Sequence, residues 1–432
     1  MNLQEVKKLE QEEFIKRDSE LCLIPSEGFP SEDVLNACSS IYSLKYAEGR
    51  VSKRYYCGCT EFDKMEKMCE ESILKLFNAE NKYNACVQPH SGSQANMIVY
   101  GALLQPNDTI LSMDTASGSH ISHNHCLSFL GKYHNIISYG LDKNGCINYE
   151  ELRELALKHK PKLIIAGISA YSRQIDFKKI KEIADEVNAY TLADCAHITS
   201  LIVSGLHQNP IDYDYTCVTM TTHKMLNGPR GGVVLYKKEL EKDITRGLIP
   251  FCQGGPLGNI IYSKLTCFNN ILNNIEAFNE YSMQILKNSK AMCKIFLENE
   301  IPIVSNGTDN HLMLIDLSND FNISGRKLSL TLEQCGIICN CNTVPNDKRS
   351  FFETSGIRVG TPFLTARGLK EEDFEHIALH ISELINLYKD NNTPDEITLD
   401  ECKVKLKSCV EYYCKKFPLR NFYPNRYKYL FD

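Results

Sequence analysis

The chain has 432 residues and a formal net charge of −6, with 43% hydrophobic and 24% charged residues. At roughly 150 residues per domain, this length predicts two or three domains with a core that needs no disulfide or metal support. The acidic balance argues against a protein built mainly to grip nucleic acid, and no apolar run approaches the ~18 residues of a membrane-spanning helix.

The first 20 residues alternate acidic and basic side chains and predict a polar helical arm. They lack the apolar core of a secretory signal and the Arg/Ser bias of a transit peptide, so we expect a cytoplasmic protein, with mitochondria as the alternative. The 19 cysteines include no CxxC pair. This spacing favours free thiols in a reducing compartment and predicts no metal site.

Helical periodicity follows at residues 61–78 and 94–104. Short, continuous apolar runs then alternate with helical stretches such as residues 178–187, and a parallel sheet covered on both faces requires such runs. The predicted strands are residues 162–167, 190–193, 215–220 and 232–236. The middle of the chain is therefore predicted to be an α/β domain.

After Pro256 the pattern changes to long helices and isolated strands, which predicts a smaller α+β domain. The predicted helices are residues 260–298, 326–334, 370–388 and 398–415, and the predicted strands are 311–317 and 356–361. We expect an N-terminal arm (1–25), a large domain (26–275) and a small C-terminal domain (276–432).

The segment VTMTTHKMLNGPRGG (218–232) runs from a strand into a hydroxyl-rich turn and a Gly-rich loop. Thr221, His223 and Lys224 lie at this strand end, where a lysine can be positioned to form a Schiff base. The alternative interpretation is a surface lysine in a threonine-rich loop.

The segment QPHSGSQAN (88–96) places Ser91, Gly92 and Ser93 before a predicted helix. Backbone amides at a helix N-terminus, together with two hydroxyls, form a phosphate-binding turn. An ordinary helix cap is the alternative.

The segment ADCAH (193–197) puts Asp194 at a strand end, so its carboxylate can face a crevice at the sheet edge. A buried aspartate there can pair with a pyridinium nitrogen, although a helix N-cap is an equal alternative. Lysine, phosphate-binding turn and pyridine partner in one α/β chain together indicate pyridoxal 5'-phosphate.

The sequence resembles the serine hydroxymethyltransferase family from about residue 23 to about residue 368. The resemblance rests on the motifs LIPSEGF (23–29), KYAEG (45–49), KRYYCGCTEFD (53–63), VQPHSGSQAN (87–96), TTHKMLNGPRGG (221–232), QGGPL (253–257), NGTDNHL (306–312) and SGIRVGTP (355–362). It implies the fold type I, aspartate-aminotransferase-like fold of pyridoxal-phosphate-dependent transferases, with a large mixed-sheet domain and a smaller α+β domain.

The resemblance also implies roles toward the cofactor. Lys224 matches the lysine that binds pyridoxal phosphate as a Schiff base, and Asp194 matches the partner of the pyridine nitrogen. The other cofactor-side residues are the phosphate turn at Ser91, Gly92 and Ser93, the ring-stacking His120, Ser169 and His197 near the ring oxygen, Thr221 before the lysine, and Gly254 and Gly255, which reach the phosphate of the neighbouring subunit. We expect His223, beside the lysine, to be catalytic together with Lys224, His120, Glu48 and Tyr56.

Arg358 matches the arginine that binds the amino-acid carboxylate, for which a guanidinium fork is suited. Glu48 matches the glutamate that moves protons between the substrate hydroxyl and folate. Tyr46, Tyr56, Ser26 and Asn342 match residues on the substrate and folate side.

These roles imply transfer of the hydroxymethyl carbon of serine to tetrahydrofolate, giving glycine and 5,10-methylenetetrahydrofolate. Because Tyr46, Glu48, Tyr56 and the glycine pair act across a subunit boundary in the family, the resemblance implies a homodimer with shared active sites. A tetramer, a homologue that binds the cofactor with little turnover, and another pyridoxal-phosphate aldolase remain alternatives.

Several positions depart from the family pattern, and none carries a named catalytic role. Extra side chains at family glycine positions can reshape loops. The departures are Gly28, the segment 50–52, Cys57, Ser119, Asn124, Met220, Asn259 and Cys341.

Overall fold

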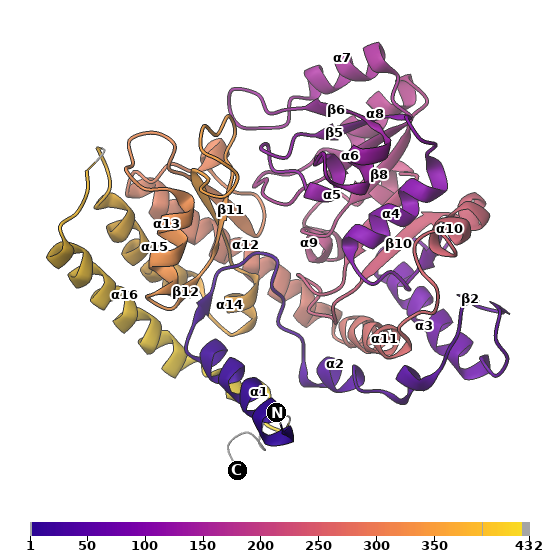
Figure 1. The fold of residues 1–432 in the computed structure, drawn as a ribbon, viewed down its shortest axis with the longest axis horizontal. Coiled ribbons are helices and arrows are strands. Elements are labelled where there is room, and N and C mark those ends of the chain that lie inside the picture. Colours follow the sequence, from indigo (N-terminus) through magenta and orange to yellow (C-terminus); the bar gives the residue numbers. More distant parts are fainter. Residues whose placement is uncertain (1, 391, 426–432) are drawn as a thin grey trace. The chain divides into compact units, whose positions relative to one another are not determined.

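The computed structural model describes residues 2–390 and 392–425, and the chain divides into two compact units (Figure 1). The first, here called the sheet unit, is Asp33–Ser282. The second, the terminal unit, combines Met1–Glu32 with Met283–Asp432. Among the described residues, none of the helices has the length and apolar character needed to cross a membrane.

The sheet unit is built on a seven-stranded mixed sheet with the order β4-β10-β9-β8-β7-β5-β6. Its strands are β4 (Tyr83–Cys86), β5 (Thr109–Met113), β6 (Asn135–Tyr139), β7 (Leu163–Gly167), β8 (Tyr190–Asp194), β9 (Cys217–Thr221) and β10 (Gly232–Lys237). The five strands from β9 to β6 are parallel, whereas β10 is antiparallel to both β9 and β4. A short hairpin of β2 (Gly49–Arg50) and β3 (Lys53–Arg54) lies outside this sheet.

Helices α4 to α9 connect the parallel strands, as parallel pairing requires. The helices of this unit are α2 (Glu32–Ala37), α3 (Thr60–Leu76), α4 (Gly92–Leu103), α5 (Ile121–Asn124), α6 (Phe129–Tyr133), α7 (Tyr149–His159), α8 (Phe177–Glu186), α9 (Thr199–Val203), α10 (Glu241–Leu248) and α11 (Gly258–Asn273), with 3-10 turns η1 (Ile41–Leu44), η2 (Pro210–Tyr213) and η3 (Lys238–Leu240). The helix α12 (Ile275–Glu298) continues from this unit into the terminal one.

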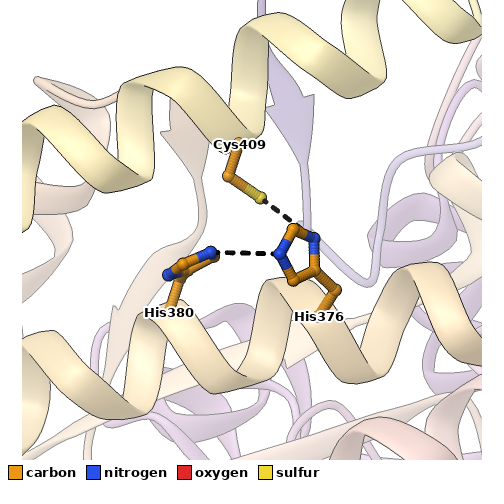
Figure 2. A group of neighbouring side chains, drawn as sticks. All are labelled: His376, His380 and Cys409. Atoms are coloured by element: carbon orange, nitrogen blue, oxygen red, sulfur yellow. Dashed lines mark hydrogen bonds between the residues drawn. The ribbon is translucent and has the colours of Figure 1, made fainter.

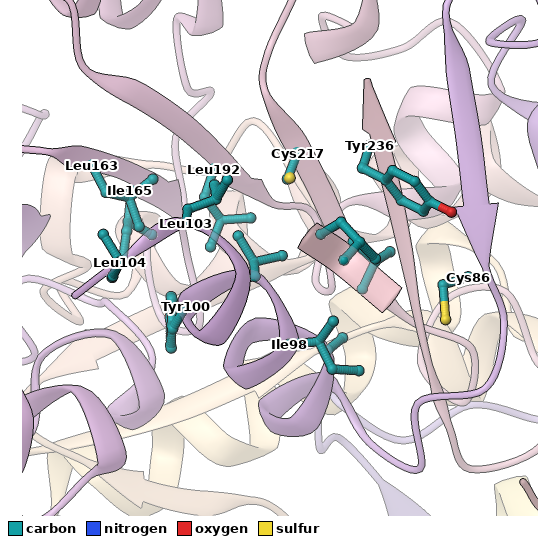
Figure 3. Close-up of a cluster of buried hydrophobic side chains, with 14 of the residues drawn as sticks. Cys86, Ile98, Tyr100, Leu103, Leu104, Leu163, Ile165, Leu192, Cys217 and Tyr236 are labelled. Atoms are coloured by element: carbon teal, nitrogen blue, oxygen red, sulfur yellow. The ribbon is translucent and has the colours of Figure 1, made fainter. Parts of the chain in front are cut away.

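A core of buried side chains joins α4 to the sheet (Figure 3). Ile98 and Tyr100 of α4 belong to the same cluster as Ile165, Leu192 and other strand residues, all with at most 1% exposure. Full burial of one such aliphatic side chain stabilises the fold by about 1.5–3 kcal/mol. This packing fixes α4, and therefore its N-terminus, against the sheet.

The carboxyl ends of the parallel strands lie at one edge of the sheet. Since β4 and β9 are both antiparallel to β10, they run in the same direction, and β5, β7 and β8 run parallel to β9. The segments after these strands therefore meet at that edge, where ligands of open α/β sheets bind. Ser91 and Lys224 follow strands that end there, and Asp194 is the last residue of β8.

The terminal unit contains a three-stranded antiparallel sheet, β11-β14-β13, and a short parallel pair, β1-β12. Its elements are α1 (Leu3–Asp18), β1 (Leu21–Cys22), η4 (Val304–Asn306), β11 (Leu312–Asp316), α13 (Gly325–Glu333), β12 (Ile337–Ile338), β13 (Asn340–Asn342), β14 (Gly356–Gly360), α14 (Pro362–Ala366), α15 (Glu371–Asn386), α16 (Glu396–Lys416) and η5 (Leu419–Phe422). Buried Arg367 donates hydrogen bonds to the carbonyls of Asp18, Glu20 and Phe417. One side chain thus ties the two ends of the chain together within this unit.

The structure confirms the predicted fold class, a large mixed α/β sheet with a smaller α+β part. Strands β7 to β10, β11 and β14, and the helices α1, α3, α4, α8, α13, α15 and α16 match predicted segments within a few residues. The single helix predicted over 260–298 is two helices, because α11 ends at Asn273 and α12 begins at Ile275. Strands β4, β5 and β6 were not predicted.

Candidate active site

A hydrogen-bonded network surrounds Asp194 at the end of β8. Its Oδ2 accepts hydrogen bonds from Asn96 Nδ2 and from His123 Nε2, each at 2.8 Å, and Oδ1 accepts one from the backbone N–H of Ala196 at 3.0 Å. Burial alone would raise the pKa of Asp194, but the bonds from His123 and Asn96 and the nearby imidazoles hold this pKa well below its usual range. The carboxylate is therefore charged at neutral pH.

A second layer of polar groups orients this network. Thr219 Oγ1 donates to Asn96 Oδ1 at 2.6 Å, and Ser119 Oγ lies 3.2 Å from His123 Nδ1. A Cβ on Gly167 would lie 2.7 Å from Asp194 Cβ and 2.8 Å from His123 Cε1, so only glycine lets both residues pack against β7. The sequence analysis missed Asn96, His123 and Thr219, although the segment SGSHISH (117–123) carries His123 three residues after His120 and could have indicated it.

The predicted phosphate turn begins α4. Ser91 Oγ accepts the N–H of Gln94 at 3.1 Å, and the first N–H groups of the helix lie at the carboxyl edge of the sheet. Gly92 lies so close to β9 that a Cβ there would be 2.7 Å from Thr221 Cγ2. A Cβ on Gly232 would be 2.3 Å from the Ser91 carbonyl oxygen. This cradle for an anion depends on the absence of side chains.

Lys264, which the sequence analysis did not identify, stabilises the phosphate turn through its ammonium group. Lys264 is buried, and its Nζ donates to the carbonyls of Val87 (2.6 Å), Pro89 (3.0 Å) and Gly232 (2.9 Å). Burial lowers the pKa of Lys264 to about 8. The side chain joins the segment before α4 to the start of β10.

Lys224 lies three residues after the end of β9 and is 8% exposed. Its neighbour His223 accepts the N–H of Gly231 at Nδ1 (3.3 Å). Burial, followed by the charges of Arg230 and Lys224, lowers the pKa of His223 to about 4. His223 is therefore a neutral imidazole at physiological pH, with its proton on Nε2.

The remaining predicted cofactor residues lie on neighbouring loops. His120 is the N-cap of α5 and accepts the N–H of Ser122 at Nδ1 (3.2 Å). Ser169 donates its backbone N–H to the carbonyl of Gly118 at 2.7 Å, which joins the loop after β7 to the loop after β5. His197 is buried, three residues after β8. The turn around His120 and the strand ends thus form one continuous region.

A second group of predicted residues gathers around Tyr46, and we call it the tyrosine–glycine set: Tyr46, Glu48, Tyr56, Gly254 and Gly255. Tyr46 donates its hydroxyl to Glu48 Oε1 (3.3 Å), and its ring contacts the Tyr56 ring edge-on with centroids 4.8 Å apart. A Cβ on Gly254 would lie 2.7 Å from Glu48 Oε1, and one on Gly255 3.2 Å from the Tyr46 ring. Tyr46 and Tyr56 are 55% and 46% exposed.

Buried polar residues fix the position of Glu48. Arg54 donates to the carbonyls on both sides of it, those of Ala47 (3.0 Å) and Gly49 (2.6 Å), and pairs with Glu66 at 2.6 Å. Gln88 donates to the carbonyl of Gly49 at 3.0 Å and to Glu66 Oε1 at 2.7 Å. Sequence reasoning found neither Arg54 nor Gln88.

Gln88 also connects the tyrosine–glycine set to the phosphate turn. Its Oε1 accepts a hydrogen bond from Gln253, the residue before Gly254, at 3.1 Å. Gln94 in the first turn of α4 donates to the carbonyl of Cys252 at 3.2 Å. The glycine pair is therefore anchored to the loops that carry Ser91 and Glu48.

Three predicted substrate residues, Ser26, Arg358 and Asn342, belong to the terminal unit. Arg358 lies on β14, is 9% exposed, and donates its Nε–H to Asn340 Oδ1 at 3.1 Å. Burial lowers the pKa of Arg358 to about 10, so a bound carboxylate would stabilise the charged guanidinium. Asn342 follows on β13, opposite Gly356.

The segment that carries Ser26 lies against the end of β14. Leu23 accepts the N–H of Gly360 at 2.8 Å, and a Cβ on Gly360 would lie 2.7 Å from Pro25. Since Gly360 is two residues after Arg358, the unit brings Ser26 and Arg358 to neighbouring segments. The sequence analysis did not identify Asn340 as the residue that orients the arginine.

The structure accounts for several departures from the family pattern. Thr219 and Thr221 contact Asn96 and the phosphate turn, so buried Met220 between them projects from the opposite face of β9. Ser119 contacts His123, and Asn124 donates to the carbonyl of Met113 at 3.1 Å.

Other departures have structural partners outside the network. Arg50 is buried and pairs with Glu70 at 2.9 Å, Asn259 donates to the carbonyl of Cys38 at 2.7 Å, and the Cys57 carbonyl accepts a bond from Lys45. The contacts of the described residues do not explain Gly28 or Cys341.

The donor groups fit pyridoxal phosphate. A buried, charged carboxylate suits a pyridinium nitrogen, the cradle at Gly92 and Gly232 suits a phosphate, and buried Lys224 suits an aldehyde. A family model described as serine hydroxymethyltransferase matches residues 1–381 of the 432. The match confirms the predicted family resemblance and fold class.

Proposed function

Because the chain belongs to the serine hydroxymethyltransferase family, we propose that it transfers the hydroxymethyl carbon of serine reversibly to tetrahydrofolate, giving glycine and 5,10-methylenetetrahydrofolate. Members of this family are pyridoxal-phosphate-dependent one-carbon transferases. The observation that carries the proposal is the buried Asp194 carboxylate, held charged by His123 and Asn96 at the sheet edge where Lys224 lies.

The residues at this edge would hold pyridoxal phosphate. Ser91, Gly92 and Ser93 would bind the phosphate at the start of α4, Lys224 would attach to the aldehyde carbon, and Asp194 would keep a proton on the pyridine nitrogen. When bound, the cofactor supplies an electron sink for the carbanion formed as the Cα–Cβ bond of serine breaks. His120, on the loop after β5, would stack on the ring.

The other residues act on the amino acid and on folate. Arg358 would bind and orient the substrate carboxylate, because a guanidinium accommodates a carboxylate with two parallel hydrogen bonds. Glu48 would move a proton between the substrate hydroxyl and folate, and the hydroxyl of Tyr46 would hold its carboxylate in place. Ser26, Tyr56 and Asn342 would each contribute to substrate or folate binding.

We propose a homodimer in which each site uses the tyrosine–glycine set of the partner subunit. The exposure of Tyr46 and Tyr56 in the single chain supports this arrangement. Mixing Lys224→Ala with Glu48→Gln tests it, since each variant alone has no complete site. Random exchange of subunits should restore about a quarter of the wild-type activity, because half the dimers then carry one intact site. A mixture as inactive as its components contradicts shared sites.

The reaction itself is tested by steady-state assays of serine cleavage with and without tetrahydrofolate. A companion measurement is the absorbance of the loaded protein before and after addition of glycine and then tetrahydrofolate. A new long-wavelength band in the ternary mixture, with folate-dependent turnover, supports the proposal. A cofactor band that never changes, with negligible turnover, supports instead a pyridoxal-phosphate-binding homologue with a regulatory role. Cleavage independent of folate supports another aldolase.

The 19 cysteines are spread along the sequence without a CxxC pair, which supports a reducing compartment. We propose the cytoplasm, with mitochondria as the alternative.

A further inference from the structure

Two helices of the terminal unit, α15 and α16, bring together three side chains with metal-binding atoms (Figure 2). His376 and His380 lie four residues apart on α15, so both imidazoles project from the same face. Cys409 projects toward them from α16. One nitrogen of each imidazole and the sulfur all lie within 4.8 Å of one another.

We propose that His376, His380 and Cys409 bind one zinc ion, with water in the fourth position. The site differs in residues and elements from the proposed active site, and nothing in the proposed function requires it.

The two imidazoles already have the separation that zinc requires. Their Nε2 atoms lie 3.2 Å apart. Two nitrogens bound at about 2.0–2.1 Å in a regular tetrahedron are about 3.3–3.4 Å apart. The Cys409 sulfur lies 3.9 Å from His376 Nδ1 and needs to approach by a side-chain rotation. An N₂S donor set suits zinc, whose filled d shell imposes no geometry of its own.

The Nδ1 atoms of His376 and His380, which would not bind the metal, have partners that favour metal binding at Nε2. His380 Nδ1 lies 3.2 Å from Glu383 Oε2, and an N–H donated to this carboxylate leaves the lone pair on Nε2. Carboxylate–histidine pairs of this kind orient zinc ligands and raise their basicity. His376 Nδ1 lies 3.1 Å from the hydroxyl of Tyr413, the residue one turn after Cys409 on α16.

The proton balance of binding follows from these contacts. Without metal, His376 Nε2–H donates to His380 Nε2, and the Tyr413 hydroxyl donates to His376 Nδ1. With zinc, His376 carries its proton on Nδ1 and donates it to the Tyr413 oxygen, which frees Nε2 for the metal. Cys409 binds as a thiolate, so one proton per site leaves to solvent.

The zinc-binding cluster is buried on the side of Cys409 and open to solvent on the side of His376. Cys409 and Tyr413 are buried, the His380 side chain is 18% exposed, and His376 is exposed. Zinc can therefore enter from the side of His376 and keep a water there. A bound ion would cross-link α15 to α16.

The test uses the full-length, cofactor-loaded protein after removal of metals with a chelator. Zinc is titrated in competition with a fluorescent chelator, and X-ray absorption at the zinc edge reports the ligands. We expect one tight site per chain, with one sulfur at about 2.3 Å and nitrogen or oxygen ligands at about 2.0–2.1 Å. Zinc should raise the melting temperature.

Variants locate the site. Glu383→Gln should weaken binding about 10–100-fold, as loss of a partner of a metal-bound histidine typically does. His380→Asn and Cys409→Ser should weaken it further and abolish the thermal shift. Cys402→Ser is the matched control, because Cys402 is a buried cysteine about two turns before Cys409 on α16. This substitution should leave the affinity for zinc unchanged.

Circular dichroism of each metal-free variant checks that it folds, and Glu383→Gln, at a partly exposed surface position, provides an independent reading if a ligand variant unfolds. Tight zinc binding that survives His380→Asn and Cys409→Ser, or absence of tight binding in the unmodified protein, would overturn the proposal. In either case the three residues are only a hydrogen-bonded contact between two helices.

Discussion

His123 Nε2 lies 2.8 Å from Asp194 Oδ2, in a buried pair that joins the short helix α5 to the end of β8. Replacing His123 with leucine removes a hydrogen bond to a charged group. Such bonds contribute about 1.5–3 kcal/mol, so we expect turnover to fall about 10- to 150-fold. His123→Gln retains an N–H donor and should lose less.

The pH profile separates this positioning role from a general loss of structure. His123 lowers the pKa of Asp194, so its removal should raise that pKa and shift the acidic limb of the turnover profile to higher pH. The substitution His125→Leu, in the same segment, is the control. Equal profiles for the wild type and His123→Leu would contradict the role.

Gly232 is required by its close approach to the phosphate turn. Alanine there would place Cβ 2.3 Å from the Ser91 carbonyl oxygen, so the start of α4 must move. Overpacking of this kind costs about 1–3 kcal/mol, and we expect the affinity for pyridoxal phosphate to fall about 5- to 150-fold in equilibrium dialysis. At Gly140 the nearest atom to an added Cβ lies at 3.6 Å, so Gly140→Ala should bind normally.

Arg358→Lys tests the predicted carboxylate site. Lysine keeps a positive charge but loses the two-pronged hydrogen bonding and the bond to Asn340. We expect KM for serine to rise about 10- to 150-fold, which corresponds to one lost charged hydrogen bond of about 1.5–3 kcal/mol. The absorbance of the bound cofactor should stay unchanged. A wild-type KM would show that Arg358 does not bind the carboxylate.

His223 predicts a pH dependence of stability. Burial lowers the pKa of His223 to about 4, below the value of about 6.5 in the unfolded chain. Between these values the unfolded chain binds the extra proton, so the free energy of unfolding falls as pH drops from about 6.5 to about 4. His223→Gln should remove of the order of 2–3 kcal/mol of this fall in urea titrations at pH 7 and pH 4.5. If the free energy of unfolding falls equally for the wild type and His223→Gln between pH 7 and pH 4.5, His223 does not cause the pH dependence.

Much of the sheet could be predicted because continuous apolar runs mark its buried central strands. Residues 163–167 and 217–221 are buried along their whole length and were easily recognised. β4 contains Asn84, and β6 is half-exposed with Asn135 and Ser138, so neither resembles a buried strand. These strands depend on pairing with neighbours far along the chain, which local pattern does not report.

The same distinction applies to the sites. Asp194 ends a predicted strand and Lys224 follows another, so their positions at the sheet edge follow from order along the chain. Ser91 was recognised instead by the predicted helix that it precedes. Asn96 and His123 contribute by hydrogen bonds to Asp194, which lies 98 and 71 residues away in the sequence. These contacts are visible only in the folded chain. The sequence shows that His376 and His380 are four residues apart on a predicted helix, but it does not show that Cys409 of another helix lies next to them.

Lys264 has a consequence for the selectivity of covalent attachment. The sheet edge carries two buried lysines, Lys224 after β9 and Lys264 beneath the phosphate turn, and either amine could in principle react with a bound aldehyde. Amines attack aldehydes through a nitrogen lone pair, and Lys264 commits three N–H bonds to three carbonyl oxygens. At pH 7, below its lowered pKa of about 8, the ammonium of Lys264 keeps all three N–H groups bonded and has no free lone pair. Lys264 therefore does not compete with Lys224 at this pH. Borohydride reduction followed by peptide mapping should find the label on Lys224 alone.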